Sequence, residues 1–189
     1  MTDREPDRQL DFLLNANRLK TTPRTGWAQR GVPSPESVAD HSHGVALTAL
    51  LLADLVDEDM DREKVLSLAV LHDLAESVTG DLSLGVSRLL PAGAKNTAER
   101  GALEELLSGL SCADRWTDLW TEFEEQASPE ARLVRDADRL DLLNQTLVYE
   151  RTTGNRQLGE FWEFAPVESF TYPASQELVR RLQARRRET

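Results

Sequence analysis

Apolar residues recur at helical spacing in nearly every segment of this 189-residue chain. Val65, Leu68, Ala69 and His72, for example, occupy positions i, i+3, i+4 and i+7 and so share one helix face. Runs in which apolar and polar residues alternate, which would indicate strands, are absent from the sequence. The pattern therefore predicts an all-α protein, and the length suffices for one domain with a well-buried core.

Helix breakers and capping residues divide the chain into separate elements. Ser37 and Asp40 form a predicted capping box, and Ser128-Pro129 supplies an N-cap with a proline in the first turn. The prolines and glycines of residues 23–35 predict an ordered loop that carries Arg24 and Trp27. The expected helices span residues 6–19, 37–56, 61–80, 96–110, 113–126 and 129–151, and a final helix follows an irregular segment at 152–173. We expect residues 1–189 to form a single helical bundle with its core at about 30–151 and a C-terminal extension at 152–189.

The sequence carries 22 basic and 33 acidic residues, a formal net charge of −11. A negative chain repels polyanions, so a nucleic-acid polymer is not an expected partner. The N-terminus lacks the apolar core of a signal peptide, no apolar run approaches the ~20 residues that cross a bilayer, and Cys112 alone cannot form an internal disulfide. We expect a cytoplasmic protein without a membrane partner.

The pair His72-Asp73, followed within one turn by Glu76, places one imidazole and two carboxylates in a stretch framed by apolar residues. Buried carboxylates are costly unless they are paired or bound to a metal. His41 lies on the apolar stripe of the preceding expected helix, whereas His43 lies roughly 200° around its axis and is expected at the surface. Two inward histidines and an adjoining aspartate predict a divalent cation held between helices.

The long helix expected after Pro129 supplies further carboxylates. Relative to Val134, both Asp138 and Asp141 fall inside the apolar stripe of that helix. Asp136 falls on the opposite side, where we expect it to be solvated. Helical spacing alone does not choose between Asp138 and Asp141 as a partner of the histidines.

Five sequence blocks make a more specific pattern. They are Arg24-Thr-Gly-Trp27, Glu36-Ser-Val-Ala-Asp40-His41-Ser42, His72-Asp73-Leu-Ala-Glu76, Thr79-Gly80-Asp81-Leu82 and Val134-Arg-Asp-Ala-Asp138. In this order they resemble the HD superfamily of metal-dependent phosphohydrolases, and in particular its 5'-deoxynucleotidase family with the eukaryotic HD-domain relatives. Asp40 departs from the glutamate that many relatives carry, and we place no motif of the family in the chain after about Gly154.

The resemblance implies a role for each matching residue. The implied ligands of one divalent metal ion are His41, His72, Asp73 and Asp138. The implied catalytic residues are Glu76 as the acid/base carboxylate, Arg24 as the group that orients the phosphate, and Asp73. The implied substrate-binding residues are Arg24, Trp27, Asp81, Leu82, Ser83 and Leu84. Imidazole and carboxylate ligands suit Co²⁺, Mn²⁺, Fe²⁺ or Zn²⁺ better than Mg²⁺ or Ca²⁺.

The expected activity is hydrolysis of (deoxy)nucleoside 5'-monophosphates to nucleoside and phosphate by a homodimer, as the resemblance implies. Another HD phosphohydrolase activity, either alarmone pyrophosphohydrolysis or phosphodiester cleavage, is the nearest alternative. The second alternative is a non-catalytic, metal-stabilised helical module that binds a partner through the face bearing Trp116 and Trp120.

Overall fold

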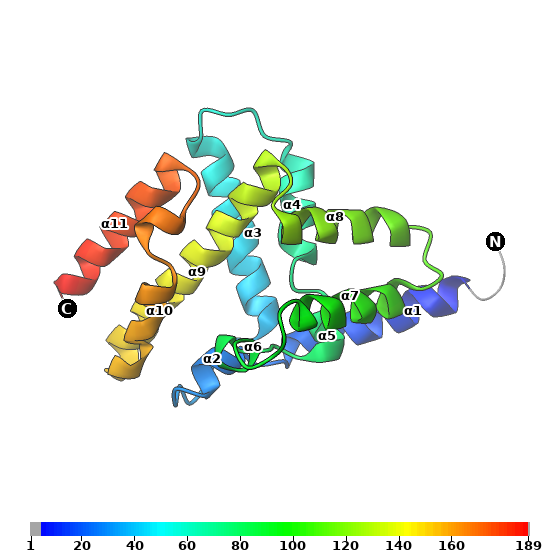
Figure 1. Cartoon of the computed structure of the whole chain (residues 1–189), viewed down its shortest axis with the longest axis horizontal. Helices are drawn as coiled ribbons and strands as arrows, with labels where there is room; N and C mark the ends of the chain where they lie inside the picture. Colours follow the sequence, from blue (N-terminus) through cyan, green and yellow to red (C-terminus); the bar gives the residue numbers. More distant parts are fainter. Residues whose placement is uncertain (1–4, 189) are drawn as a thin grey trace.

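A computed structural model describes residues 5–188, except for the side chain of Leu84. Within this range the chain is helical and contains no strand, which confirms the all-α prediction (Figure 1). The α-helices are α1 (Glu5–Ala16), α2 (Thr25–Ala28), α3 (Val38–Leu55), α4 (Arg62–Leu71), α5 (Glu76–Thr79), α6 (Leu84–Ser87), α7 (Ala94–Leu107), α8 (Ala113–Glu125), α9 (Pro129–Thr153), α10 (Glu160–Phe164) and α11 (Pro173–Arg187). Short 3₁₀ helices are η1 (Asn17–Lys20), η2 (Arg156–Gly159) and η3 (Val167–Ser169).

Helices α3 and α9 cross at the centre of the molecule, with α4 and α8 to one side and α10 and α11 to the other (Figure 1). The apolar stripes predicted from the sequence meet in this centre. The largest buried cluster joins Val45 and Leu52 of α3, Leu68 of α4, and Val134 and Leu143 of α9, all of which are fully buried. The candidate site lies on the same three segments, at His41 of α3, His72 after α4 and Asp138 of α9.

Two predicted helix starts are confirmed by their capping bonds. The Ser37 hydroxyl accepts a hydrogen bond from the Asp40 amide at 3.1 Å, and the Asp40 carboxylate accepts one from the Ser37 amide at 2.9 Å. The Ser128 hydroxyl accepts a bond from the Ala131 amide at 3.1 Å. These caps satisfy amides that helix ends leave unpaired, and they fix where α3 and α9 begin.

The predicted continuous helix over residues 61–80 is wrong, because α4 ends at Leu71 and α5 begins only at Glu76. Between them the amides of Leu74 and Glu76 bond three residues back, at 3.1 and 3.0 Å, instead of four. The His72 ring nitrogen Nδ1 lies 2.7 Å from the carbonyl oxygen of Ala69, which in a regular helix accepts from residue 73. A contact between the His72 side chain and the backbone therefore accompanies the break between α4 and α5.

Three local expectations also need correction. The predicted loop at 23–35 contains the helical turn α2, and the predicted irregular segment at 152–173 contains α10 and two 3₁₀ turns. Asp136, expected to be solvated, is only 1% exposed. It accepts hydrogen bonds from the amides of Thr171 and Tyr172, both at 2.9 Å, because the C-terminal segment packs on that side of α9.

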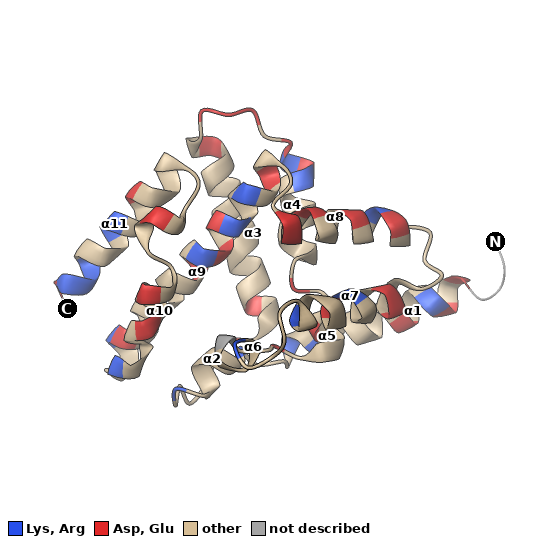
Figure 2. Cartoon of the chain, viewed as in Figure 1, with Lys and Arg blue, Asp and Glu red and all other residues tan. Residues whose placement is uncertain are grey.

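The face of α8 proposed for a partner is covered by the chain itself. Trp120 is buried, and Trp116 packs against Phe12 of α1 with ring centroids 5.4 Å apart. Acidic residues are instead prominent on α8 and in the loop between α3 and α4, as Figure 2 shows. Among residues 5–188, no helix combines the length and apolar content that crossing a membrane requires.

Candidate active site

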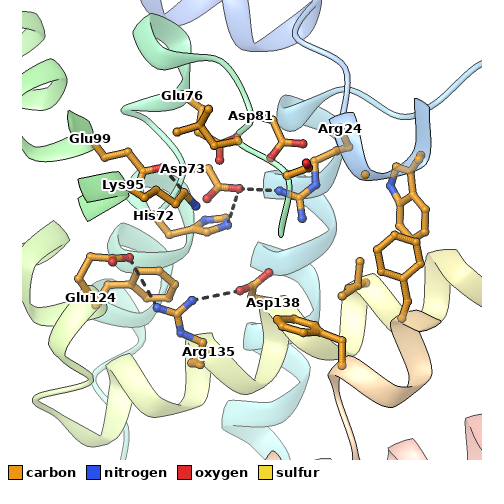
Figure 3. A pocket seen from close by; sticks show the side chains of 18 of the residues that line it. Arg24, His72, Asp73, Glu76, Asp81, Lys95, Glu99, Glu124, Arg135 and Asp138 are labelled. Carbon is orange, nitrogen blue, oxygen red and sulfur yellow. Dashed lines mark hydrogen bonds and ion pairs between the residues drawn. The ribbon is translucent and has the colours of Figure 1, made fainter. Parts of the chain in front are cut away.

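Three helical segments bring the four implied metal ligands together. His41 comes from α3, His72 and Asp73 from the turn after α4, and Asp138 from α9 (Figure 3 shows the last three). His41 Nε2 lies 3.8 Å from an Asp73 oxygen and 3.2 Å from an Asp138 oxygen, and His72 Nε2 lies 3.2 Å from the same Asp73 oxygen. One ligand atom each from His41, His72 and Asp73 fits within a span of 4.8 Å, and Asp138 joins through its contact with His41.

The remaining ring nitrogens of both histidines are held by neighbours. His72 Nδ1 must carry its proton in the 2.7 Å contact with the Ala69 carbonyl, because that oxygen can only accept. His41 Nδ1 lies 2.8 Å from Asp141, so the two acidic residues that spacing could not separate flank His41 on opposite nitrogens. Such contacts at the second nitrogen are typical of metal-binding histidines, since they fix the tautomer and the ring orientation.

The residues present fit a divalent ion. His72 Nε2 is buried and faces an Asp73 oxygen at 3.2 Å, but once Nδ1 carries the proton both atoms are acceptors, so no hydrogen bond joins them. A buried acceptor without a partner is costly, and a cation would satisfy it. The nitrogen and carboxylate donors around it match the preference of first-row transition ions. The cluster is therefore a candidate His/Asp metal site.

Without a cation, the cluster retains protons. Burial and nearby Arg24 lower the pKa of His41, but the hydrogen bonds to Asp138 and Asp141 outweigh both and raise it to about 9. Burial would raise the pKa of Asp138, yet its contacts with His41 hold that pKa well below its ordinary value. In the metal-free protein the protonated His41 ring thus supplies the positive charge that a metal ion would otherwise bring. Metal binding at His41 must displace that proton.

Glu76 lies beside the ligands as a carboxyl group of a different kind. It is 2% exposed, and its Oε2 has no hydrogen-bond partner within residues 5–188. Burial, followed by the charges of Asp73 and Asp81, raises the pKa of Glu76 to about 10. A carboxyl group that keeps its proton at neutral pH can donate it to a leaving group.

Arg24 reaches the cluster from the loop before α2. Its Nη1 lies 3.2 Å from Asp73 Oδ2, and the pKa of Arg24 stays above its ordinary value because Asp73 and other carboxylates outweigh the effect of burial. Asp81 holds this loop, since its carboxylate accepts from the Thr25 amide and its carbonyl accepts from the Thr25 hydroxyl at 2.8 Å. The acid at position 81 thus fixes the backbone next to Arg24.

One cavity of about 180 Å³ is lined by Arg24, His72, Asp73, Glu76 and Asp138, whereas His41 is fully buried and does not line it. Of the implied substrate-binding residues, Arg24, Trp27, Asp81, Leu82 and Ser83 line it, whereas the side chain of Leu84 lies outside the described part of the structure. Trp27 is also part of a buried hydrophobic cluster. Its Nε1 donates to Glu36 at 2.9 Å, and its ring lies 4.3 Å from that of Phe161.

The cavity is also lined by residues to which the resemblance assigns no role. They are Gly26, Arg30, Lys95, Glu99, Phe123, Glu124, Arg135, Leu142, Phe161 and Phe164. Lys95 and Glu99 pair at 3.2 Å across one turn of α7, and Arg135 contacts Glu124 and Asp138 (Figure 3). The i,i+4 spacing of Lys95 and Glu99 was a visible signal, but it is equally typical of a solvated helix face.

The helical fold and the histidine–aspartate cluster together define an HD-domain protein. The family described as HD domain matches residues 16–171 of the chain. The 5'-deoxynucleotidase HDDC2 of Danio rerio is 35% identical over 159 residues, which cover 82% of this chain and 77% of that protein. The 5'-deoxynucleotidase hdd1 of Schizosaccharomyces pombe is 36% identical over 155 residues, covering 79% and 77%. The chain belongs to the HD-domain family and, within it, to the family of these relatives, which confirms the resemblance.

Solved structures agree with this assignment. The PH0347 protein from Pyrococcus horikoshii OT3 superposes with a TM-score of 0.79 at 36% identity, covering 95% of this chain and 99% of that one. A protein from Magnetospirillum magnetotacticum MS-1, described as a predicted metal-dependent phosphohydrolase, gives a TM-score of 0.76 at 23% identity, covering 98% and 97%. At that lower identity, the second likeness supports the fold alone.

Proposed function

We propose that the protein is a 5'-deoxynucleotidase, which hydrolyses deoxynucleoside 5'-monophosphates to nucleoside and phosphate. One observation carries the proposal. Two buried atoms, His72 Nε2 and Glu76 Oε2, have no hydrogen bond within residues 5–188, and both residues line one cavity with Arg24. His72 Nε2 can bind a metal ion, the Glu76 carboxyl group can transfer a proton, and the Arg24 guanidinium can bind a phosphate. The names of the relatives, 5'-deoxynucleotidases, support the same substrate class.

In this proposal His41, His72, Asp73 and Asp138 hold one divalent ion. When bound, such an ion supplies Lewis-acid stabilisation of the charge that builds on the phosphate. Its class is Co²⁺, Mn²⁺, Fe²⁺ or Zn²⁺, and the donor set does not select one of these. Asp73 has a second task, because its contact with Arg24 holds the guanidinium at the edge of the cluster.

The other groups of the cavity act on the substrate directly. Arg24 orients the phosphate with a planar, permanently charged group. A water oxygen forms a bond to phosphorus as the bond from phosphorus to the 5'-oxygen breaks, and Glu76 delivers the proton of its carboxyl group to that leaving 5'-oxygen. The proton that the attacking water loses then returns the Glu76 carboxylate to its acid form. Trp27, Asp81, Leu82, Ser83 and Leu84 complete the proposed substrate site. Asp81 contributes by fixing the Arg24 loop.

A substrate panel tests this function. After complete chelation, the protein is supplied in turn with Co²⁺, Mn²⁺, Fe²⁺ or Zn²⁺, and phosphate release is measured from dAMP, dGMP and TMP. AMP, a cyclic nucleotide and an alarmone serve as competing substrates. Preferential release from the deoxynucleotides supports the proposal. Preferential cleavage of the cyclic nucleotide or the alarmone would favour the alternative HD phosphohydrolase activities.

The non-catalytic alternative makes a different prediction in the same experiment. A metal-stabilised module would lose thermal stability on chelation but would cleave no compound in the panel. The structure weighs against the partner face named for this alternative, because Trp120 is buried and Trp116 is partly covered by its contact with Phe12 of α1. A scaffold also has no need for an unpartnered carboxyl group such as Glu76 beside the ion.

The proposal includes a homodimer in the cytoplasm, with residues 1–189 as a single HD domain. A surface stripe on α3 supports self-association. Leu47, Leu51 and Leu55 follow one another at intervals of four residues and are 57%, 52% and 48% exposed. A contiguous exposed apolar stripe often marks a protein–protein interface, and a two-fold axis would bury it against its own copy.

A further inference from the structure

The cavity has two chemically different ends. Its polar end carries His72, Asp73, Asp138 and Glu76 with the cations Arg24, Lys95 and Arg135. Its other end is mainly apolar: Trp27, Leu142 and Phe161 belong to one packed cluster, Phe164 adds a further apolar wall, and the Arg30 guanidinium lies against the Phe161 ring. A molecule that joins an anionic group to a planar, weakly polar ring would match both ends at once.

Phe164 is the residue at the apolar end whose ring is available to a ligand. It keeps 40% of its surface exposed, whereas Phe161 and Trp162 of the same helix keep 5% and 6%. Burying the latter two contributes to the fold, since they belong to packed clusters with α3, α9 and the segment around Trp27. Exposed phenylalanine on a cavity wall leaves apolar area in contact with water, and a stacking ligand would cover it.

The helix that carries Phe164 is held by contacts of three of its other residues, Glu160, Phe161 and Trp162. The Phe161 ring packs on Trp27, and the Arg30 guanidinium lies 4.5 Å from the Phe161 ring centroid. Arg30 itself donates to the Gly26 carbonyl at 2.7 Å and pairs with Glu160. Trp162 Nε1 donates to Glu150 of α9 at 3.3 Å. A pre-organised aromatic platform loses little entropy when a ring stacks on it.

We propose that Phe164 is a specificity-determining residue that stacks on the nucleobase of the substrate. This inference rests on the proposed function, because it requires a ligand whose phosphate occupies the polar end. Stacking is tolerant of base identity, since every base has a π-face, and alanine substitution at stacking residues typically weakens binding about 5- to 100-fold. Phe164 would thus favour nucleotides over other phosphomonoesters without selecting a particular base.

The test compares a nucleotide with a phosphomonoester that has no base. Hydrolysis of dAMP, TMP and 2-deoxyribose 5-phosphate is measured for the metal-loaded wild type, Phe164→Ala and Phe164→Tyr. The preference in kcat/KM for the nucleotides over 2-deoxyribose 5-phosphate should fall about 5- to 100-fold in Phe164→Ala, mainly through KM. Phe164→Tyr, which keeps an aromatic ring, should retain the wild-type preference. Leu89→Ala, which removes an 87% exposed leucine outside the cavity lining, is the matched surface control.

Two results would overturn the inference. If Phe164→Ala lowers kcat/KM for all three substrates by the same factor, the residue supports the fold rather than a base. If kcat/KM stays at the wild-type value for all three substrates, the base lies elsewhere. Calorimetric binding of dAMP separates this inference from the proposed function. A wild type that binds dAMP without cleaving it refutes the proposed activity, and Phe164→Ala must then still weaken that binding. A wild type that neither binds nor cleaves dAMP refutes both.

Discussion

At the residue scale, Glu76 is the clearest example of a buried group whose properties suit catalysis rather than stability. It is buried, its Oε2 has no hydrogen-bond partner among the described residues, and the charges of Asp73 and Asp81 add to burial in raising its pKa to about 10. A residue kept for stability alone would not combine these properties, because a glutamine or an apolar side chain would cost less. Substitutions at this position therefore test whether Glu76 acts as a catalytic proton donor or only contributes to stability.

Glu76→Gln should lower phosphate release from deoxynucleotides by about 10²- to 10⁴-fold while metal content stays at the wild-type level. It should also raise the melting temperature of the metal-free protein at pH 8. The raised pKa of Glu76 gives stability that is present below the unfolded value of 4.5 and is lost as pH rises toward 10, and glutamine avoids this loss. Steady-state kinetics, metal analysis and thermal melts at pH 5 and pH 8 measure the three effects.

The exposed Glu105 on α7 provides a matched control for that experiment. Glu105→Gln removes the same charge outside the cavity, so both activity and the pH dependence of melting should stay at the wild-type level. Near-normal turnover in Glu76→Gln would remove this carboxyl group from the proposed mechanism.

The two acids around His41 should affect metal affinity to different degrees. Asp138→Asn removes a proposed ligand and should give the larger loss. Asp141→Ala removes the contact at His41 Nδ1 and should weaken metal affinity about 10- to 100-fold, a typical cost for a residue that orients a ligand. Competition with a chromophoric chelator measures both constants, with the exposed Asp118→Ala as control. An unchanged affinity in Asp141→Ala would mean that His41 needs no such support.

At the element scale, the caps and stripes of the sequence predicted α3 and α9 well. Ser37 and Ser128 are local signals, and the residues they cap follow within one turn. The break after Leu71 could not be predicted from helical spacing, because neither the change to shorter backbone bonds nor the accompanying contact of the His72 ring with a backbone carbonyl leaves a periodic signal. Asp136 was misjudged for a related reason. Its partners lie 35 and 36 residues further along the chain, beyond the reach of helical periodicity.

The packing of α3 on α9 makes an unusual prediction about Gly44. A Cβ at this position would lie 2.2 Å from a carboxylate oxygen of Asp141, so the substitution must displace the side chain that holds His41. Glycine to alanine inside a helix ordinarily stabilises by roughly 0.5–1 kcal/mol. Gly44→Ala should instead destabilise the protein and weaken metal binding. Urea unfolding and chelator competition measure the two effects.

Gly101 of α7 is the matched control, because a Cβ there meets nothing within 4 Å. Gly101→Ala should stabilise the protein by roughly 0.5–1 kcal/mol without changing metal affinity. If both glycine variants gained stability equally, the contact between α3 and Asp141 would be more tolerant than the structure indicates.

At the scale of the whole molecule, the sequence predicted the all-α architecture and the meeting of the four implied ligands, but only half of the cavity. The five sequence blocks end at Asp138, whereas Phe161 and Phe164 lie in the extension that the resemblance did not cover. Lys95 lies one position before the helix expected at 96–110, to which no residue of the site was assigned. Residues that join a site through tertiary packing alone leave no periodic signal in the sequence.

Self-association is the prediction that belongs to this scale. If α3 pairs with its own copy, light scattering after size-exclusion chromatography should give twice the mass of the 21.2 kDa chain. Leu51→Glu, which places a charge in the centre of the exposed stripe, should shift the mass toward that of one chain, because an unpaired charge in an apolar interface is costly. Glutamate at the exposed Val70 of α4 is the control, and it should leave the mass unchanged. A monomeric wild type would exclude the homodimer.

The two most distant of the proposed ligands, His41 and Asp138, lie 97 positions apart along the chain. An ion gripped by both would act as a reversible cross-link that closes more than half of the polypeptide into a loop, and unfolding would have to release it. Metal supply and protein lifetime then become linked quantities. In a cell short of the preferred ion, the molecules that cannot work would also be the ones that open most readily and are degraded first.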